Sequence, residues 1–198
     1  MVTSSWAEPI RLSAMYFTQR FSNLIQYVNG GPPSYKGSYA NLTGASSNGY
    51  EAEVALLPSS NWRGTASYTI VNPRVTEVPP GYQGGANVGD ALIRRPSHSG
   101  SVVASYSRPA NASIGIAVNF VGKRADTDFA QFPSPRVTLP AYAKLDISAE
   151  LPIATRNRGG LTLNARLENA FNKAYEDVLH FPAPGRTLLV GARASTLF

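Results

Sequence analysis

The sequence has no cysteine among its 198 residues, so a disulfide framework and a thiolate metal site are both excluded. Charged residues are scarce as well: they form 15% of the chain, against roughly 25% in soluble domains. The net charge of +6 comes from Lys and Arg residues that are scattered along the chain. Because no dense basic run appears, we predict no nucleic-acid partner.

Long apolar runs are also missing. No stretch approaches the roughly 18 consecutive apolar residues of a transmembrane helix, which excludes only a helical crossing of a membrane. A barrel strand needs just about 9–11 residues with apolar side chains at alternate positions. The first residues, MVTSSWAEPIRL, lack the charged and apolar regions of a signal peptide, so we expect no signal peptide in this chain.

What the sequence does contain is alternation of apolar and polar residues, in segments separated by Gly, Pro, Asn and Ser. Leu161, Leu163, Ala165 and Leu167, for example, share one face of such a segment. We count about eight segments and no amphipathic helix. Those with clear bounds cover residues 10–20, 51–56, 62–70, 114–120, 143–148, 161–168 and 187–198.

The segments predict an all-β, antiparallel sheet with one apolar face. Leu163 and Val118 are expected to point to lipid, and Asn164 and Asn119 to the interior of a barrel. Short connections such as PSSN and RPANA alternate with long ones such as TEVPPGYQGGANVGDA. Outer-membrane barrels show this asymmetry, with tight periplasmic turns and longer outer loops.

A soluble β-sandwich is the alternative, because its strands also alternate and its turns also use Gly and Pro. The polar faces here are rich in Ser, Thr and Asn rather than in the Lys and Glu that crowd a solvated face. This composition favours the barrel.

The end of the chain carries a family signature. NAFNKAY and PGR resemble the penultimate strand and last hairpin of TonB-dependent outer-membrane receptors. The matching residues are Asn169, Phe171, Asn172, Lys173, Tyr175, Pro184, Gly185 and Arg186. Phe198 is similar to the family's terminal aromatic residue, which the resemblance implies is recognised during barrel assembly.

Three further stretches agree: NGYEAE at 48–53, LIRRPSHSG at 92–100 and FVGKRADTDF at 120–129. The resemblance therefore covers roughly residues 10–198, and residues 122–142 look most like receptors for cobalamin and related chelates. Three departures are Asn48 in place of the usual Arg, Ala170 in place of the usual Leu, and Thr196 where an aromatic residue is common, since STLF extends the ending by about two residues.

The resemblance implies that residues 1–198 are the C-terminal part of an integral outer-membrane receptor of a Gram-negative bacterium. Such transporters have about 22 strands, so we expect an open arc of a larger barrel without plug domain. The function implied is TonB-dependent uptake of a chelate such as cobalamin or an iron-siderophore. The expected partners are outer-membrane lipid, upstream strands, the plug, TonB through the plug, and the chelate. The alternative is a self-contained eight-stranded barrel with a structural or adhesive role.

Candidate ligand contacts are aromatic and polar loop residues, because large ligands are bound by aromatic side chains and a few polar groups. They are Tyr35, Tyr82, Gln83, Asp126, Asp128 and Phe132. Charged residues of the inner face are expected to pair with one another or with a plug: Glu51, Glu53, Arg63, Lys144, Asp146, Arg166 and Glu168.

The sequence gives no support for catalysis. His98 and His180 are the only histidines, they lie in separate segments, and neither belongs to a metal-binding pattern. We therefore predict no enzymatic activity, no cofactor and no metal site.

Overall fold

The chain forms one large β-sheet with two small hairpins beside it. The computed structural model describes residues 9–28, 30–33, 36–80, 85–108, 112–156 and 159–196. No helix in this described part is long and apolar enough to cross a membrane.

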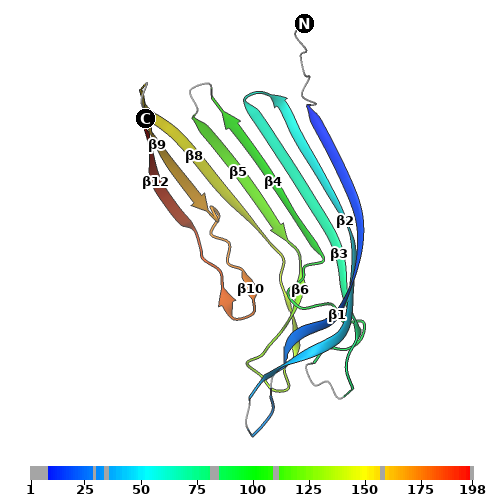
Figure 1. Cartoon of the computed structure of the whole chain (residues 1–198). Coiled ribbons are helices and arrows are strands. Elements are labelled where there is room, and N and C mark those ends of the chain that lie inside the picture. The colour runs from blue at the N-terminus through cyan, green and yellow to red at the C-terminus, as the bar shows by residue number, and fades with distance from the viewer. Residues whose placement is uncertain are drawn as a thin grey trace.

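Eight strands pair antiparallel in the order β1-β2-β3-β4-β5-β8-β9-β12 (Figure 1). Their bounds are β1 Ile10–Val28, β2 Ser38–Ser59, β3 Trp62–Glu77, β4 His98–Ser107, β5 Ser113–Val121, β8 Tyr142–Arg156, β9 Gly159–Glu168 and β12 Thr187–Thr196. The small hairpins are β6 Arg124–Thr127 with β7 Arg136–Leu139, and β10 Glu176–Val178 with β11 Phe181–Pro182. The predicted all-β antiparallel arrangement is confirmed.

The register places the apolar side chains on one face of this sheet, because paired residues of neighbouring strands point the same way. Leu163 pairs with Leu151 and Ala192, whereas Asn164 pairs with Glu150 and Gly191. The apolar face is left open: Leu12 is 71% exposed and Val190 is 72% exposed. No second layer covers this face within the described residues, so the arrangement is not a sandwich, and such a surface is typical of strands that face lipid.

Aromatic residues border the apolar face. Trp62 contacts Tyr106 beside the short turns, with ring centroids 4.8 Å apart, and Tyr16 contacts Tyr50 toward the other end, with centroids 5.1 Å apart. Aromatic side chains prefer the two interfaces of a membrane. The outward face therefore has the two aromatic borders of a membrane-spanning strand array.

The two ends of the sheet differ as the loop lengths predict. β1 begins and β12 ends at one end, together with the two-residue turn between β2 and β3 (Figure 1). The long connections after β1, β3, β5 and β9 all lie at the opposite end. We refer to these as outer loops 1 to 4.

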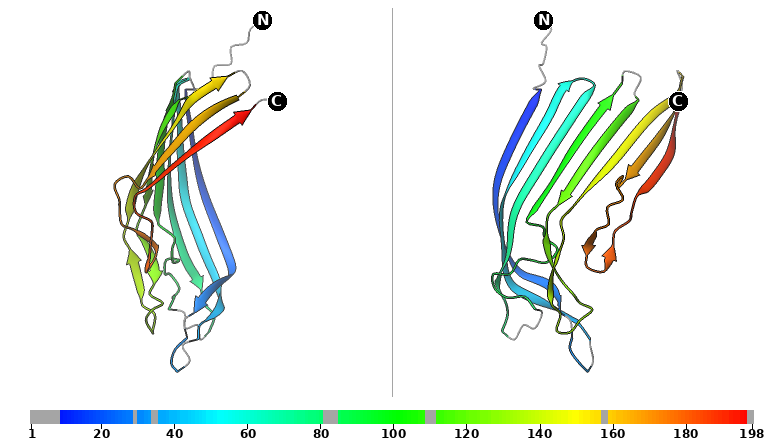
Figure 2. Two further views of the ribbon diagram at one scale, coloured as in Figure 1. Left: turned by 90° about the vertical axis from the view of Figure 1, so that its left-hand side faces the viewer. Right: turned by 180° about the vertical axis from the view of Figure 1, so that it is seen from behind.

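The sheet does not close on itself. β1 and β12 stand at the two ends of the strand order and at opposite edges of the sheet in Figure 1 and in the right-hand view of Figure 2. The predicted open arc is therefore what the structure contains, and a closed eight-stranded barrel is not formed.

Candidate functional site: outer loops and inner face

The β6–β7 hairpin of outer loop 3 is the point at which the outer loops meet. Arg124 pairs with Leu139 and Thr127 with Arg136, so the hairpin is a short ladder standing beyond the end of β5. Residues of loops 1, 2 and 4 each contact this hairpin or the turn at its tip.

Asp126 joins three of the loops. Its Oδ1 accepts hydrogen bonds from Arg94 Nε of loop 2 at 3.0 Å and from the Thr127 backbone N–H at 2.8 Å. Its Oδ2 accepts the Leu179 backbone N–H of loop 4 at 2.9 Å. The Asp126 side chain is 0% exposed. A buried carboxylate without hydrogen-bond partners would destabilise the fold, and here Arg94 of loop 2 and Leu179 of loop 4 are among its partners.

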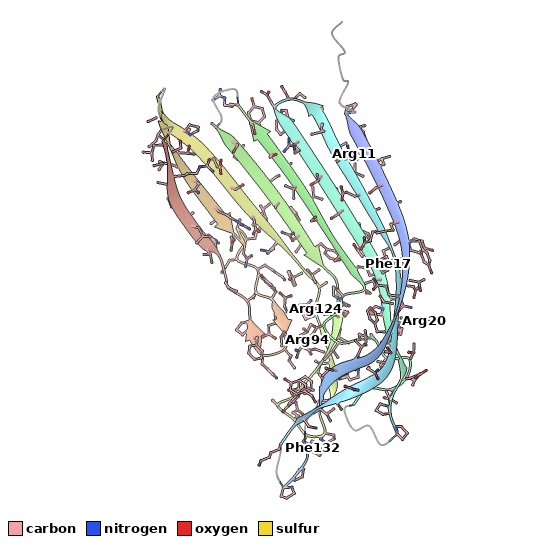
Figure 3. The ribbon with its side chains drawn as sticks, in the orientation of Figure 1. Arg11, Phe17, Arg20, Arg94, Arg124 and Phe132 are labelled. Atoms are coloured by element: carbon pink, nitrogen blue, oxygen red, sulfur yellow. The ribbon has the colours of Figure 1, made fainter. Side chains whose placement is uncertain are left out.

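Arg124 makes a second connection between loops 3 and 4. Its side chain is 2% exposed and pairs with Asp177 at 2.9 Å, and its guanidinium also donates to the Glu176 carbonyl. The Arg124 guanidinium lies over the Tyr142 ring, with its Cζ 5.5 Å from the ring centroid. The Tyr142 hydroxyl donates a hydrogen bond to the same Asp177 carboxylate at 2.9 Å. Figure 3 shows Arg94 and Arg124 close together, between the end of the sheet and the tip of the loops.

Loop 2 contacts the β6–β7 hairpin on one side and the end of β3 on the other. Arg136 of β7 lies 3.8 Å from the Asp90 carboxylate and donates to the Ala91 carbonyl. On the other side, a small core forms at the end of the sheet around Val75 and Ala86. Loop 2 is therefore folded back over the end of β3.

Aromatic side chains gather at the tip. Tyr27 at the end of β1 contacts Tyr39 and Phe129, with centroids 5.6 and 5.8 Å apart. Phe132, 46% exposed, lies against Gly31 of loop 1, where a Cβ would come within 2.5 Å of the ring (Figure 3). A side chain at this position would displace the exposed Phe132 ring.

The predicted ligand contacts differ in their exposure to solvent. Tyr35, Tyr82 and Gln83 lie outside the described residues. Asp126 and Asp128 are buried with their carboxylates hydrogen-bonded, whereas Phe132 is exposed at the tip. Sequence reasoning did not select Tyr27, Tyr39 or Phe129, although each stands beside a loop rich in Gly or Pro.

Asp128 links loops 3 and 4 through an ionisable pair. It accepts the Ala130 backbone N–H at 3.0 Å and lies 3.1 Å from His180 Nε2. The Ala130 hydrogen bond, followed by those from His180 and Gln131, lowers the pKa of Asp128 below its ordinary value of 3.8, against the opposing effect of burial.

This lowered pKa predicts acid-induced loosening of loop 4. A carboxylate with a lowered pKa in the folded state contributes its full stability above 3.8, and the contribution is lost as the pH falls further through the lowered value. We expect the protection factors of the amides in loops 3 and 4, which correct hydrogen exchange for its intrinsic pH dependence, to fall as the pH drops below 3.8. In Asp128→Asn the protection should be reduced already at neutral pH and change less below pH 3.8; an unchanged profile would contradict the assignment.

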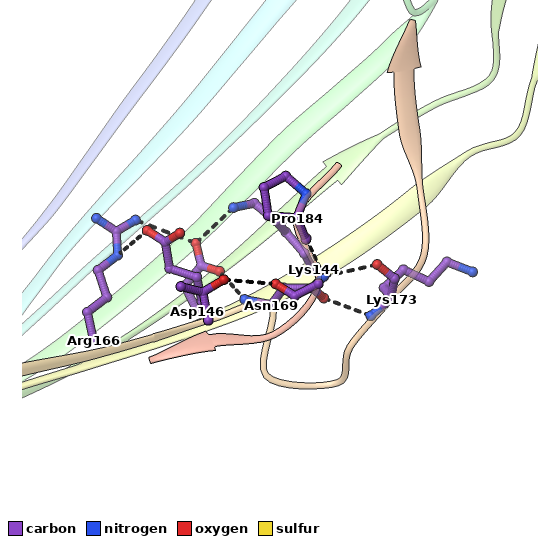
Figure 4. A network of polar contacts seen from close by, with 9 residues as sticks. Lys144, Asp146, Arg166, Asn169, Lys173 and Pro184 are labelled. Carbon is purple, nitrogen blue, oxygen red and sulfur yellow. Dashed lines mark hydrogen bonds and ion pairs between the residues drawn. The ribbon is translucent and has the colours of Figure 1, made fainter. Parts of the chain in front are cut away.

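The inner face carries a chain of ion pairs. Asp146 of β8 lies 3.1 Å from Lys144 Nζ and 3.7 Å from Arg166, and Arg166 lies 3.1 Å from Glu168 (Figure 4). Asp146 also accepts the Asn169 backbone N–H at 2.9 Å. The prediction that inner charges pair with one another is confirmed for the four charged residues of this network. The described part of the chain provides no ion pair for Glu51, Glu53 or Arg63.

The family signature forms a hydrogen-bonded turn above this network. Asn169, at φ 49° and 3% exposed, accepts the Lys173 backbone N–H at 2.8 Å and donates to the carbonyls of Lys173 and Pro184 (Figure 4). Asn172 accepts the Arg186 backbone N–H at 2.9 Å, and a Cβ on Gly185 would approach its Oδ1 to 2.7 Å. These contacts join the two sides of loop 4.

The remaining signature residues have different surroundings. Tyr175 stacks on Tyr142 at 4.0 Å, which places loop 4 beside loop 3. Phe171 is 79% exposed, and Phe198 lies outside the described residues.

Removing the Asn169 side chain should destabilise loop 4. Asn169→Ala loses three hydrogen bonds and leaves alanine at positive φ, so we expect a cost of about 2–3 kcal/mol in local opening. Lys173→Ala is the matched control, since Lys173 contributes only backbone groups to this turn. Hydrogen exchange of residues 169–186 measures both, and equal effects would contradict the role of Asn169.

Below loop 2 the inner face is hollowed. A cavity of about 670 Å³ is lined by apolar side chains of β1, including Met15, Phe17 and Phe21, and by Leu92 and Arg95 of loop 2. The inner face therefore combines a polar half on β8 and β9 with a more apolar half on β1.

Comparison with known proteins agrees with this geometry. Residues 5–170 match the family described as TonB dependent receptor-like, beta-barrel. The metal-pseudopaline receptor CntO of Pseudomonas aeruginosa is 27% identical over 164 residues, which cover 79% of this chain and 22% of CntO. The vitamin B12 transporter BtuB of Vibrio cholerae is 34% identical over 71 residues, 36% of this chain and 11% of BtuB.

Solved structures share the fold. The pyoverdine outer-membrane receptor FpvA of Pseudomonas aeruginosa has a TM-score of 0.66 at 18% identity, over 93% of this chain and 27% of FpvA. The FrpB iron transporter of Neisseria meningitidis has a TM-score of 0.67 at 16% identity, over 94% of this chain and 29% of FrpB. This chain thus spans between about a tenth and three tenths of the proteins it matches. The chain belongs to the family of TonB-dependent receptor β-barrels, which are proteins of the Gram-negative outer membrane.

Proposed function

We propose that this chain supplies part of the wall and four outer loops of a TonB-dependent receptor that takes up a metal chelate or a cobalamin-like ligand. The observation that carries the proposal is the joining of the outer loops onto the β6–β7 hairpin, at the outer end of a sheet whose inner face is polar on β8 and β9 and more apolar on β1. Loops held in this way form a fixed surface beside the entrance to a barrel, where a large ligand would be captured first.

Within this surface the aromatic tip is the proposed ligand contact. Phe132, between β6 and β7, is 46% exposed, and Tyr39, at the start of β2, is 76% exposed, so a flat or ring-containing chelate could contact both. Asp126 and Asp128 would act indirectly, because their carboxylates hold the loops rather than face solvent.

The inner face is the proposed contact for a plug supplied by the remainder of the receptor, through which TonB would act. The remainder would also complete a barrel of about 22 strands, with its upstream strands adjoining β1 and β12. We propose no catalytic role for this chain. His98 bonds to Tyr68 at 3.1 Å and His180 to Asp128, at separate places.

Uptake by the complete receptor tests the proposal. Cells that depend on the receptor would be supplied with ferric siderophores, a metal-pseudopaline complex or cyanocobalamin, each carrying a radioactive metal. We expect uptake of one of these chelates, and Phe132→Ala should weaken its binding about tenfold. Phe181→Ala, which removes another exposed aromatic residue of the outer loops, is the matched control. The absence of uptake for every chelate would overturn the proposal, and equal effects of the two variants would overturn the ligand contact.

A further inference from the structure

The outward face of β1, β2 and β3 changes character in regular rows toward the outer loops. Tyr16, Tyr50 and Ile70 pair across the three strands in one row. The next outward-facing row is Thr18, Asn48 and Asn72, and the row after it is Arg20, Ser46 and Arg74. The face thus passes from apolar and aromatic to amide and then to basic side chains.

The basic row lies at the depth of lipid headgroups. Tyr16 and Tyr50 belong to the outer aromatic border, where side chains of this type meet the membrane interface. Arg20 follows Tyr16 by four residues, or about 13 Å along the strand at roughly 3.3 Å per residue. Figure 3 shows Arg20 where β1 bends toward the outer loops, on the loop side of the row of Tyr16 and Tyr50.

A hollow exists at this place. A cavity of about 530 Å³ on the sheet is lined by Thr18, Arg20, Ser46 and Asn48, with Tyr16 on its membrane side. Glu77 is the one acidic residue that lines it, and it pairs with Gly44, two residues beyond Ser46. The hollow therefore presents guanidinium, hydroxyl and amide groups nearest the membrane.

The two guanidinium groups are not neutralised by neighbours. Among the residues that the structure describes, no carboxylate lies within ion-pair distance of Arg20 or Arg74. Arg74 is held in place by hydrogen bonds from Nε to Asn72 Oδ1 at 2.8 Å and from Nη1 to the Gly89 carbonyl at 3.2 Å. Its other N–H groups remain available for a ligand.

We propose that this basic row is a binding site for the phosphate-bearing headgroup of an outer-leaflet lipid. Guanidinium groups bind phosphate through paired hydrogen bonds, and the Ser46 hydroxyl lies between the two arginines to add a further donor. Basic side chains at a membrane surface bind anionic lipids by the same chemistry. The site is on the lipid side of the wall, so a chelate that passes along the inner face would not reach it.

Lipid binding to the complete receptor in detergent tests the site. Native mass spectrometry would titrate lipid A that carries its phosphates, lipid A without phosphates, and inorganic phosphate. We expect binding of the phosphorylated lipid alone, weakened about fivefold in Arg20→Gln and further in Arg20→Gln with Arg74→Gln. Arg11→Gln with Arg63→Gln is the matched control, because it removes the same charges from inner-face positions of β1 and β3.

Three results would overturn the proposal: equal binding of both lipids, an equal loss in the control, or unchanged binding in the double variant. Binding of inorganic phosphate with the same affinity would show a free-anion site instead of a lipid site. The single variant Arg20→Gln, at an exposed position, keeps the test available if the double variant does not fold. Failure here leaves the proposed uptake function untouched, since that function depends on the inner face and the loops.

Discussion

Replacing Asp126 with alanine is expected to release loops 2 and 4 from the β6–β7 hairpin. The substitution leaves Arg94 without its ion-pair partner and the Leu179 N–H without its acceptor. Removing one partner of a buried ion pair costs about 3–5 kcal/mol. Because Arg94 is partly exposed, we expect about 3 kcal/mol, visible as faster hydrogen exchange and protease cleavage in three loops at once.

Asp90→Ala is the control for this prediction. Asp90 belongs to the same loop region but is more exposed, and its ion pair with Arg136 is 3.8 Å long. We expect an effect of about 1 kcal/mol or less, confined to loop 2. If Asp126→Ala raised hydrogen exchange in a single loop and left the other two unchanged, Asp126 would not be the residue that joins the three loops.

The second large effect is expected from a charge on the outward face of the sheet. Leu163→Arg would place a guanidinium among Leu151, Ala192 and lipid, at a cost of about 2–4 kcal/mol near the middle of the membrane. Asn164→Arg, one residue along, would lie beside Glu150 on the inner face and should be tolerated. The amount of folded receptor in the outer membrane measures both variants, and equal losses would show that the two faces are assigned wrongly.

The face of each strand could be predicted from the sequence because the period of two is a local property. The alternation of Leu161, Leu163, Ala165 and Leu167 needs no knowledge of neighbouring strands, and β9 has the predicted orientation. The common end of the long loops could be predicted in the same way. Neighbouring strands of an antiparallel sheet run in opposite directions, and the long connections follow every second strand of the sheet.

The organisation of the outer loops could not be predicted, because it depends on contacts between distant segments. Asp126 stands in RADTDF, which has the composition of a solvated loop. Its burial arises from Arg94 and Leu179, which lie 32 and 53 residues away in the chain. No local pattern marks these partners.

The signature NAFNKAY was identified by resemblance, and the structure gives its physical cause. Asn169 and Asn172 adopt positive φ, which asparagine tolerates better than most residues, and each makes a hydrogen bond across loop 4, to the Pro184 carbonyl and from the Arg186 N–H respectively. Gly185 is needed because of its approach to Asn172.

Disulfide trapping tests most directly whether this chain is an arc of a larger barrel. The chain has no cysteine, so within residues 1–198 only introduced thiols can react. Cysteines in place of Leu12 and Val54, which pair between β1 and β2, should crosslink in the folded receptor. Cysteines in place of Leu12 and Val190, on the outward faces of β1 and β12, should not, because the two edges face other strands. A β1–β12 disulfide formed as readily as the control would show a closed eight-stranded barrel and contradict the account.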